Sequence, residues 1–97
     1  MLNSRQRAQL RAMANDYETI LQIGKSGILD TTVKQAVDAL EARELIKVKL
    51  LETCPTTVKE IAEQLAQATN SDVVQVIGRK FILYKESKNN KTIKLVK

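Results

Sequence analysis

The chain has 97 residues, of which 43% are apolar and 28% charged, so its length and composition fit one compact domain with a single hydrophobic core. It contains no histidine and one cysteine, which excludes an internal disulfide and a Cys/His zinc site and removes the commonest general base of enzymes. The net charge is +5 and no apolar run approaches the roughly 18 residues of a membrane span, so we expect a cytoplasmic protein that is not an enzyme and holds no metal or cofactor.

The first part of the chain predicts a helix, a short strand and a tight loop. Asn3 or Ser4 can cap a helix that continues to about residue 15, with apolar side chains at helical spacing. Residues 19–23 are rich in β-branched and apolar side chains, which favours a strand that stops at Gly24. We expect residues 24–27, Gly-Lys-Ser-Gly, to form a tight loop after this strand.

The middle of the chain predicts a second helix and a second strand. Asp30, Thr31 or Thr32 begins the helix, which ends near Arg43, because apolar residues recur there at i, i+3, i+4 and i+7. Apolar and charged residues alternate over residues 45–50, which is typical of a strand with one face in solvent. The alternation places on one face Ile46, Val48 and Leu50, and on the other Lys47 and Lys49.

A third helix and two further strands follow. Thr57 and Glu60 match a capping box at the start of the helix, and Asn70 is expected to stop it. Residues 73–77 and 80–84 both have the composition of strands. The two residues between these strands predict a β-hairpin.

The order of elements, α-β-α-β-α-β-β, predicts a single compact α/β domain with a mixed four-stranded sheet. Two strand-helix-strand units favour parallel neighbours joined by right-handed crossovers, and the closing hairpin adds an antiparallel edge. We assign residues 1–86 to this domain and residues 87–97 to a basic C-terminal tail. Polar residues interrupt the apolar strands, which implies that the helices leave part of one sheet face uncovered. These residues are Gln22, Lys47, Lys49 and Gln75.

Positive charge is concentrated at the two ends of the chain. Residues 1–15 carry three arginines and no acid, and residues 79–97 carry seven basic residues and one acid. The segment between them, residues 16–78, carries six basic and ten acidic residues. This distribution favours a basic surface that faces a polyanion, although a charge bias that only improves solubility would give the same composition.

The loop after the first strand is the sharpest candidate for a binding site. Gly24 and Gly27 permit positive φ angles and let backbone amides approach a phosphate, while Lys25 supplies charge and Ser26 a hydrogen-bond donor. The same pattern also serves as an ordinary turn between a strand and a helix. A nucleotide-binding P-loop is excluded because Thr19 stands where its first glycine is required, and a dinucleotide fingerprint is excluded because the chain has no Gly-x-Gly.

Further basic residues can extend this site. Arg5, Arg7 and Arg11 stand on a helix without acidic partners, and arginine favours bidentate contacts with phosphate. Aromatic residues make up only 3%, too few for a base-stacking sheet, so contacts with a nucleic-acid backbone are preferred. Carboxylate pairs at i, i+3, such as Asp38 with Glu41, are interpreted as solvated helix faces. The strand and hairpin residues that could join the site are Lys47, Lys49, Arg79 and Lys80.

Three separated blocks of the sequence resemble the bacterial YhbY family, the stand-alone form of the CRM domain (chloroplast RNA splicing and ribosome maturation). The blocks are ILQIGKSG at residues 20–27, ALEARELIKVK at 39–49 and VQVIGRKFILY at 74–84. They occur in the family's order, and the likeness extends over about residues 2–86.

The resemblance implies a fold similar to the C-terminal domain of bacterial translation initiation factor three, and association with precursors of the large ribosomal subunit. It also implies that the Gly-x-x-Gly loop and neighbouring basic residues contact RNA, with Arg5, Arg7 and Arg11 matching the family's basic positions in the first helix. By analogy with the loop of KH domains, these contacts would be to the sugar-phosphate backbone.

We therefore expect a monomeric RNA-binding protein that associates with immature large-subunit ribosomal RNA and assists ribosome assembly. The alternative is a protein-interaction module that docks on a ribosomal protein or an assembly factor through the polar sheet face. Binding to duplex DNA is disfavoured because no helix-turn-helix is evident, and a hydrolase would need a carboxylate with a raised pKa in a cleft. The expected RNA contacts are Arg5, Arg7, Arg11, Gly24, Lys25, Ser26, Gly27, Lys47, Lys49 and Arg79.

Overall fold

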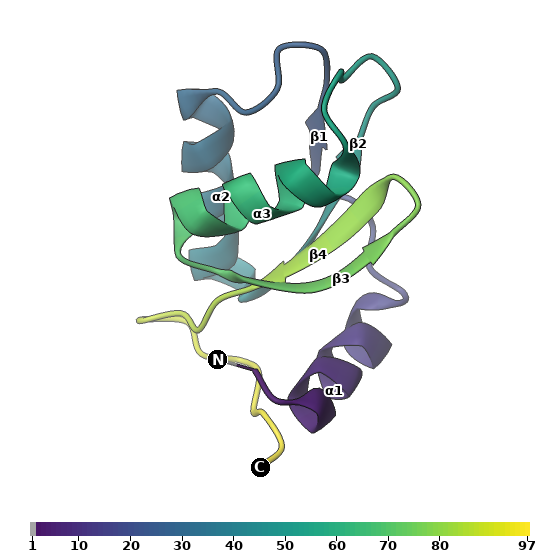
Figure 1. Ribbon diagram of the computed structural model, residues 1–97. Coiled ribbons are helices and arrows are strands. Elements are labelled where there is room, and N and C mark those ends of the chain that lie inside the picture. Colours follow the sequence, from purple (N-terminus) through teal and green to yellow (C-terminus); the bar gives the residue numbers. More distant parts are fainter. Residues whose placement is uncertain (1) are drawn as a thin grey trace.

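The computed structural model describes residues 2–97, which form three helices and one four-stranded sheet (Figure 1). The helices are α1 (Ser4–Ala14), α2 (Asp30–Arg43) and α3 (Val58–Thr69). The strands are β1 (Leu21–Ile23), β2 (Leu45–Leu50), β3 (Asp72–Ile77) and β4 (Lys80–Tyr84). The predicted order of elements is confirmed, although β1 begins two residues later than expected and β3 begins one residue earlier. No helix within residues 2–97 is long and apolar enough to cross a membrane.

Polar side chains mark the helix ends that the sequence predicts. The side chain of Asn3 accepts the backbone N–H of Gln6 at 2.8 Å, and the Gln6 side chain accepts that of Asn3 at 3.0 Å, so α1 begins with a capping box. The hydroxyl of Thr57 accepts the backbone N–H of Glu60 at 3.3 Å at the start of α3. Asn70 ends α3 in the left-handed conformation, as predicted.

The sheet has the strand order β1-β2-β4-β3. β1 and β2 are parallel neighbours, as the first strand-helix-strand unit predicts, but β4 inserts between β2 and β3 and pairs antiparallel with both. The parallel neighbours expected for the second unit are therefore wrong. Burial explains the order, because every residue from Phe81 to Tyr84 is buried, and a strand buried on both faces belongs inside a sheet. Gly78, with φ of 56°, forms the tight turn of the hairpin.

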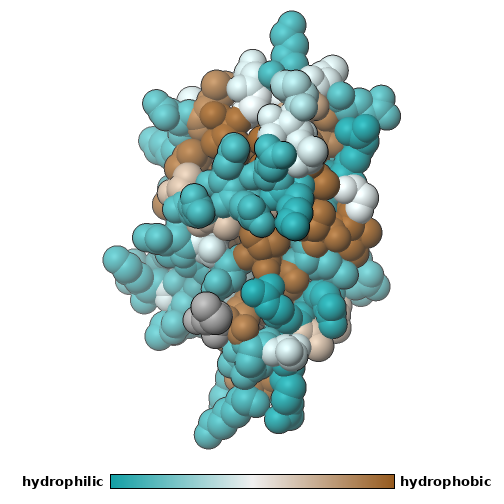
Figure 2. Space-filling model, in the orientation of Figure 1, coloured by the Kyte–Doolittle hydropathy of each residue, from teal (hydrophilic) through white to brown (hydrophobic). Residues whose placement is uncertain are grey.

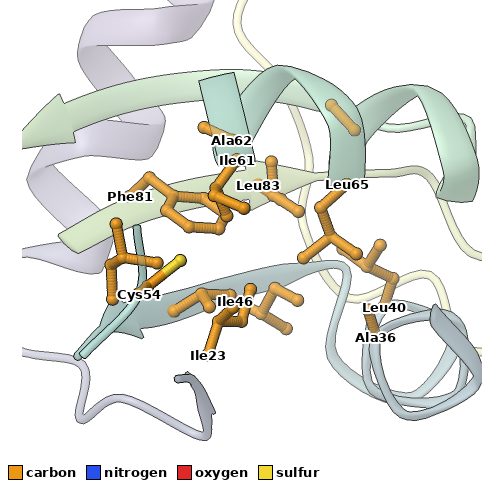
Figure 3. Packing of buried hydrophobic residues seen from close by; sticks show 13 residues of the cluster. Ile23, Ala36, Leu40, Ile46, Cys54, Ile61, Ala62, Leu65, Phe81 and Leu83 are labelled. Carbon is orange, nitrogen blue, oxygen red and sulfur yellow. The ribbon is translucent and has the colours of Figure 1, made fainter. Parts of the chain in front are cut away.

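Helices lie on both faces of the sheet, so two hydrophobic clusters form where the composition predicts one core. α2 and α3 cover one face, where side chains of α3 meet those of β4 and β2 (Figure 3). Leu65 and Phe81 are almost fully enclosed in this larger cluster, and burial of a side chain of this size stabilises the fold by about 1.5–3 kcal/mol. On the other face, Leu10 and Ala14 of α1 pack with residues of β2, β3 and β4.

α1 covers only one end of its sheet face. Leu45, the first residue of β2, is fully buried in the α1 cluster, whereas Lys47 and Lys49 further along the same face are only half-buried. Gln22 and Gln75 also keep part of their surface in solvent. The expected uncovered part of one sheet face is therefore confirmed, and it lies between α1 and the loop that follows β1.

Residues 85–97 contact the domain at the α1 end. Ile93 and Leu95 pack against the smaller cluster, and the side chain of Gln9 bonds to the backbone of Lys94 and Val96, both at 2.8 Å. The surface at this end is mostly hydrophilic on the side that Figure 2 shows. The division of the chain into a domain and a tail at residue 86 stays a prediction.

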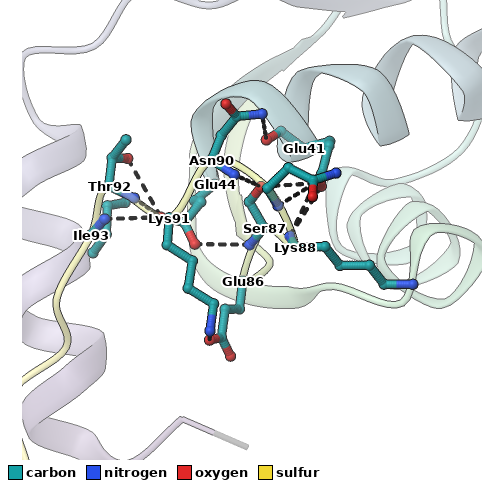
Figure 4. Close-up of polar contacts among 10 residues, drawn as sticks. Glu41, Glu44, Glu86, Ser87, Lys88, Asn90, Lys91, Thr92 and Ile93 are labelled. Carbon is teal, nitrogen blue, oxygen red and sulfur yellow. Dashed lines mark hydrogen bonds and ion pairs between the residues drawn. The ribbon is translucent and has the colours of Figure 1, made fainter.

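Glu44 holds this C-terminal segment from the end of α2 (Figure 4). Its buried carboxylate accepts the backbone N–H groups of Ser87 at 2.8 Å, Thr92 at 2.6 Å and Ile93 at 2.8 Å. Burial alone would raise the pKa of Glu44, but these N–H groups outweigh it and hold the pKa below its ordinary value. The backbone of Glu44 has a φ of 66°, which residues other than glycine rarely adopt. The residue that holds the C-terminal segment therefore has a strained backbone.

Glu41, one turn earlier, binds the same segment. Its carboxylate accepts the hydroxyl of Ser87 at 2.9 Å and the backbone N–H groups of Lys88 at 3.0 Å and Asn89 at 3.1 Å. These hydrogen bonds, that of Ser87 first, lower the pKa of Glu41. Glu41 therefore keeps part of its surface in solvent but also binds the C-terminal segment, which its interpretation as a solvated helix face did not include.

Candidate nucleic-acid interface

The loop of residues 24–27 is a closed turn at one end of the molecule (Figure 1). The N–H of Gly27 donates to the carbonyl of Gly24 at 3.0 Å. Gly27 has a φ of 67°, and an added Cβ there would meet nothing within 4 Å. Gly24 has no positive φ, and its Cβ would make ordinary contacts of 3.5 Å with Leu51 and Thr53. Of the two glycines that permit a positive φ in this loop, only Gly27 therefore adopts one.

The tip of this loop points into solvent. Lys25 and Ser26 are both exposed, and neither of their backbone N–H groups donates to an acceptor within residues 2–97. The N–H of Gly27 is not available in the same way, because it closes the turn. The loop thus offers two amides, one ammonium group and one hydroxyl, a set of donors that suits a phosphate.

The three arginines of α1 differ in their surroundings. Arg5 and Arg11 are exposed, and neither forms an ion pair with a residue that the structure describes. Arg7 is half-buried, and one of its guanidinium nitrogens donates to the backbone carbonyl of Val73 in β3. Arg7 therefore fastens α1 to the edge strand, although a guanidinium group has further donors that remain free for another partner.

Basic residues from two strands meet on the uncovered sheet face. Lys49 of β2 is the direct cross-strand partner of Lys80 of β4. Their row continues to Gln22 of β1 on one side and Ile77 of β3 on the other. Like charges that face each other across a sheet are unfavourable, so this pairing is not explained by stability. Lys80, which the sequence places at the hairpin, therefore lies on the same sheet face as Lys47 and Lys49.

A hollow of about 200 Å³ opens in the same face. Its apolar part comes from Ile82 and from Ile77, which is 59% exposed. None of its polar side chains forms a hydrogen bond or an ion pair with any residue from 2 to 97. The lining residues are Asn15, Lys47, Gln75, Ile77, Lys80 and Ile82. Sequence reasoning found the lysines and Gln75 as polar interruptions of strands, but not that they share a cavity with Asn15.

A β-bulge in β3 directs Gln75 into this hollow. The register shifts between Val73, opposite Leu83, and Gln75, opposite Ile82, so Val74 is an extra residue. Val74 packs in the α1 cluster and Gln75 lines the hollow beside it, so two consecutive residues serve the same face. Regular alternation would send Gln75 toward the opposite, apolar side, and the bulge prevents this.

Arg79 lies at the tip of the β-hairpin, at the same end of the sheet as the glycine loop. Its carbonyl accepts the N–H of Leu50 at 2.6 Å, and the next residue, Leu51, donates to Ile23 at the end of β1. The Arg79 side chain is exposed and borders an open hollow with Glu52 and with the segment of residues 54–58 that leads into α3.

The predicted contacts therefore form three groups along the molecule. The glycine loop and Arg79 lie at one end, the lysines on the sheet face, and the α1 arginines at the other end. About 16 Å of β2 separates Leu45, beneath α1, from Leu50, beside the loop, at about 3.3 Å per residue. The one ion pair found within residues 2–97 joins Lys91 and Glu86, so no carboxylate forms an ion pair with any of these groups.

Several known proteins are similar to this chain. The model of the CRS1 / YhbY (CRM) domain family matches residues 2–85. The "Probable RNA-binding protein YqeI" of Bacillus subtilis is 46% identical, over 98% of this chain and 99% of that protein. An RNA-binding protein of Haemophilus influenzae is 28% identical, over 93% of this chain and 91% of that protein. The solution structure of protein SAV1595 from Staphylococcus aureus aligns with a TM-score of 0.83 and 48% identity, over 99% of this chain and 100% of that one.

Proposed function

Because this chain belongs to the CRS1/YhbY (CRM) domain family, we propose that it is an RNA-binding protein that associates with ribosomal RNA of the immature large subunit and assists its assembly. The family match bears out the resemblance of the three sequence blocks. The names of the relatives support RNA as the partner. The observation that supports the proposal most is the exposed loop tip of Lys25 and Ser26, at one end of a surface whose basic residues form no ion pair with any residue from 2 to 97.

In this proposal the protein acts by charge neutralisation and positioning, without covalent chemistry. The ammonium group of Lys25 and the guanidinium groups of Arg5 and Arg11 contact phosphates and displace counterions. The free amides at the loop tip fix the position of one phosphate, since backbone donors cannot turn away from it. Reduced repulsion between phosphates would let two segments of immature ribosomal RNA approach each other, which is how such a protein assists assembly.

The salt dependence of binding tests the RNA contacts. Fluorescence anisotropy with a structured fragment of large-subunit ribosomal RNA should show affinity falling steeply with salt. Lys25→Ala combined with Arg11→Ala should lower affinity and reduce the salt slope by about 0.7–0.9 for each lost phosphate contact. Lys34→Ala combined with Lys59→Ala removes the same charge from exposed positions of α2 and α3 and is the matched control. Equal losses in the two double variants would contradict the proposed surface.

Association with the immature subunit needs a test in cells. Crosslinking followed by sequencing of the attached RNA should recover large-subunit ribosomal RNA, enriched in its precursor form. A pull-down treated with nuclease separates this proposal from the protein-interaction alternative. Ribosomal proteins should be lost with the RNA, and ribosomal proteins retained after complete RNA removal would favour direct protein docking instead.

A further inference from the structure

We propose that the hollow on the uncovered sheet face is a subsite for one unpaired base of the bound RNA. The inference rests on the proposed function and extends it, because the glycine loop and the arginines account only for contacts with the RNA backbone. The subsite would let the protein prefer RNA with a base outside a helix over a fully paired stem.

The size and lining of the hollow suit a single base. Its volume of about 200 Å³ is below the roughly 300–1,000 Å³ of pockets for drug-sized ligands, so it fits a small planar group and not a folded segment. Ile77 and Ile82 offer apolar contacts to the faces of a ring. Asn15 and Gln75 carry amides that can donate and accept at its polar edge. This combination of apolar faces and a polar edge is the chemistry of a nucleobase.

The charges around the hollow favour an anionic ligand, such as a nucleotide, over a neutral small molecule or a basic peptide. Lys47 and Lys80 line it, and Lys49 stands beside Lys80 in the next position of the sheet. No carboxylate belongs to the lining. An unstacked base brings its own phosphates to the rim, where these ammonium groups lie, so a nucleotide satisfies both parts of the site at once.

The hollow is also within reach of an RNA held by the loop. Gln22 stands in the row of Lys49 and Lys80, two strands from Lys80 or about 10 Å at the usual strand spacing, and Lys25 is three residues further along the chain, at most about 10 Å more. The bulge at Val74 gives the same face the amide of Gln75, and bulges recur beside functional sites because they redirect side chains.

The test uses a matched pair of exposed residues on opposite faces of β3. Ile77, 59% exposed, lines the hollow, whereas Val76, 39% exposed, does not line it and pairs with Phe81 of the opposite face. The probes are one fully paired RNA hairpin and four hairpins with the same stem and one bulged nucleotide, each with a different base. Anisotropy with the full chain gives the affinity for each probe.

The expected result is a preference of the wild type for at least one bulged hairpin. Ile77→Ala should lower that affinity by about three- to ten-fold, since an aliphatic contact is worth less than aromatic stacking, and leave the paired hairpin unchanged. Val76→Ala should change neither. With 4-thiouridine at the bulge, photocrosslinking should label a peptide of residues 73–80.

Two other outcomes would separate the two proposals. If Ile77→Ala and Val76→Ala behave alike, while Lys25→Ala with Arg11→Ala still weakens every hairpin, the base subsite is wrong and the proposed function stands. That result would favour a protein as the partner of the sheet face. If no hairpin and no ribosomal RNA fragment binds with an affinity that depends on salt, both proposals fail.

Discussion

Lys49 in β2 and Lys80 in β4 face each other directly across the sheet, and neither forms an ion pair with any residue in the described part of the chain. Opposed like charges weaken a sheet, and cross-strand pairs of this kind change stability by about 0.2–1 kcal/mol. A bound polyanion would turn this repulsion into attraction, because both ammonium groups could then face phosphates. The pair therefore links the stability of the free protein to the ligand that it binds.

Replacing one of these lysines should move stability and RNA affinity in opposite directions. Lys80→Gln should raise the free energy of unfolding by about 0.2–0.5 kcal/mol, because the repulsion is gone, and should weaken binding of structured RNA. Urea unfolding and fluorescence anisotropy measure the two effects. Lys34→Gln on α2 removes the same charge away from the sheet and should change neither by much. A Lys80→Gln variant that is less stable than the wild type would contradict the claim that Lys49 and Lys80 repel each other in the free protein.

The two loop glycines should tolerate alanine differently. Gly27→Ala should cost about 1 kcal/mol of stability, because an L-residue is strained at a φ of 67°. Gly24→Ala should cost less, since its φ is not positive and its Cβ would make ordinary contacts. Thermal or urea unfolding compares the two variants. An equal loss in both would show that the turn depends on Gly24 for a reason other than φ.

Arg7 and Arg11 should separate into a structural and a binding residue. Arg7→Ala should lower the free energy of unfolding by about 1–2 kcal/mol, because it removes a charge-assisted hydrogen bond to Val73. Arg11→Ala, at an exposed position of the same helix, should leave stability unchanged and weaken RNA binding. Unfolding curves for both variants, followed by RNA titrations, distinguish them. A lower free energy of unfolding in Arg11→Ala would show that Arg11, like Arg7, has a structural role.

Glu44 should anchor the C-terminal segment. Glu44→Gln keeps the shape but turns an amide donor toward backbone N–H groups, so we expect a loss of about 1–3 kcal/mol. Hydrogen exchange at Ser87, Thr92 and Ile93 should accelerate in the same variant. Glu63→Gln on the exposed face of α3 is the control and should have no effect.

The same carboxylate should make stability depend on pH. The pKa of Glu44 is lowered in the folded protein, so the unfolded chain binds its proton first as the pH falls. The contribution of Glu44 to the free energy of unfolding is complete above the ordinary carboxyl pKa of about 4.3. It is lost as the pH falls below that value toward the lower pKa that Glu44 has in the folded protein. Glu41 acts in the same direction. The difference in unfolding free energy between wild type and Glu44→Gln should therefore shrink between pH 5 and pH 3.

Local patterns predicted most of the elements, because their causes lie within a few residues of each other. The alternation of apolar and charged residues over 45–50 predicted the bounds of β2. Asn70 was expected to end α3 because asparagine adopts the left-handed conformation readily, and it does end the helix in that conformation. The glycine loop and its exposed lysine were likewise visible in four residues. The sequence by itself thus determined the helices and strands, the family, and the residues of the loop.

Only the tertiary structure decided which distant residues meet. The insertion of β4 between β2 and β3 places Lys80 opposite Lys49, and the bulge at Val74 brings Gln75 to the hollow that Lys47 also lines. Neither follows from periodicity, since register and bulges depend on how whole strands pack against both helical layers. The role of Glu44 could not be predicted from local patterns either, because its hydrogen-bond partners lie more than forty residues further along the chain.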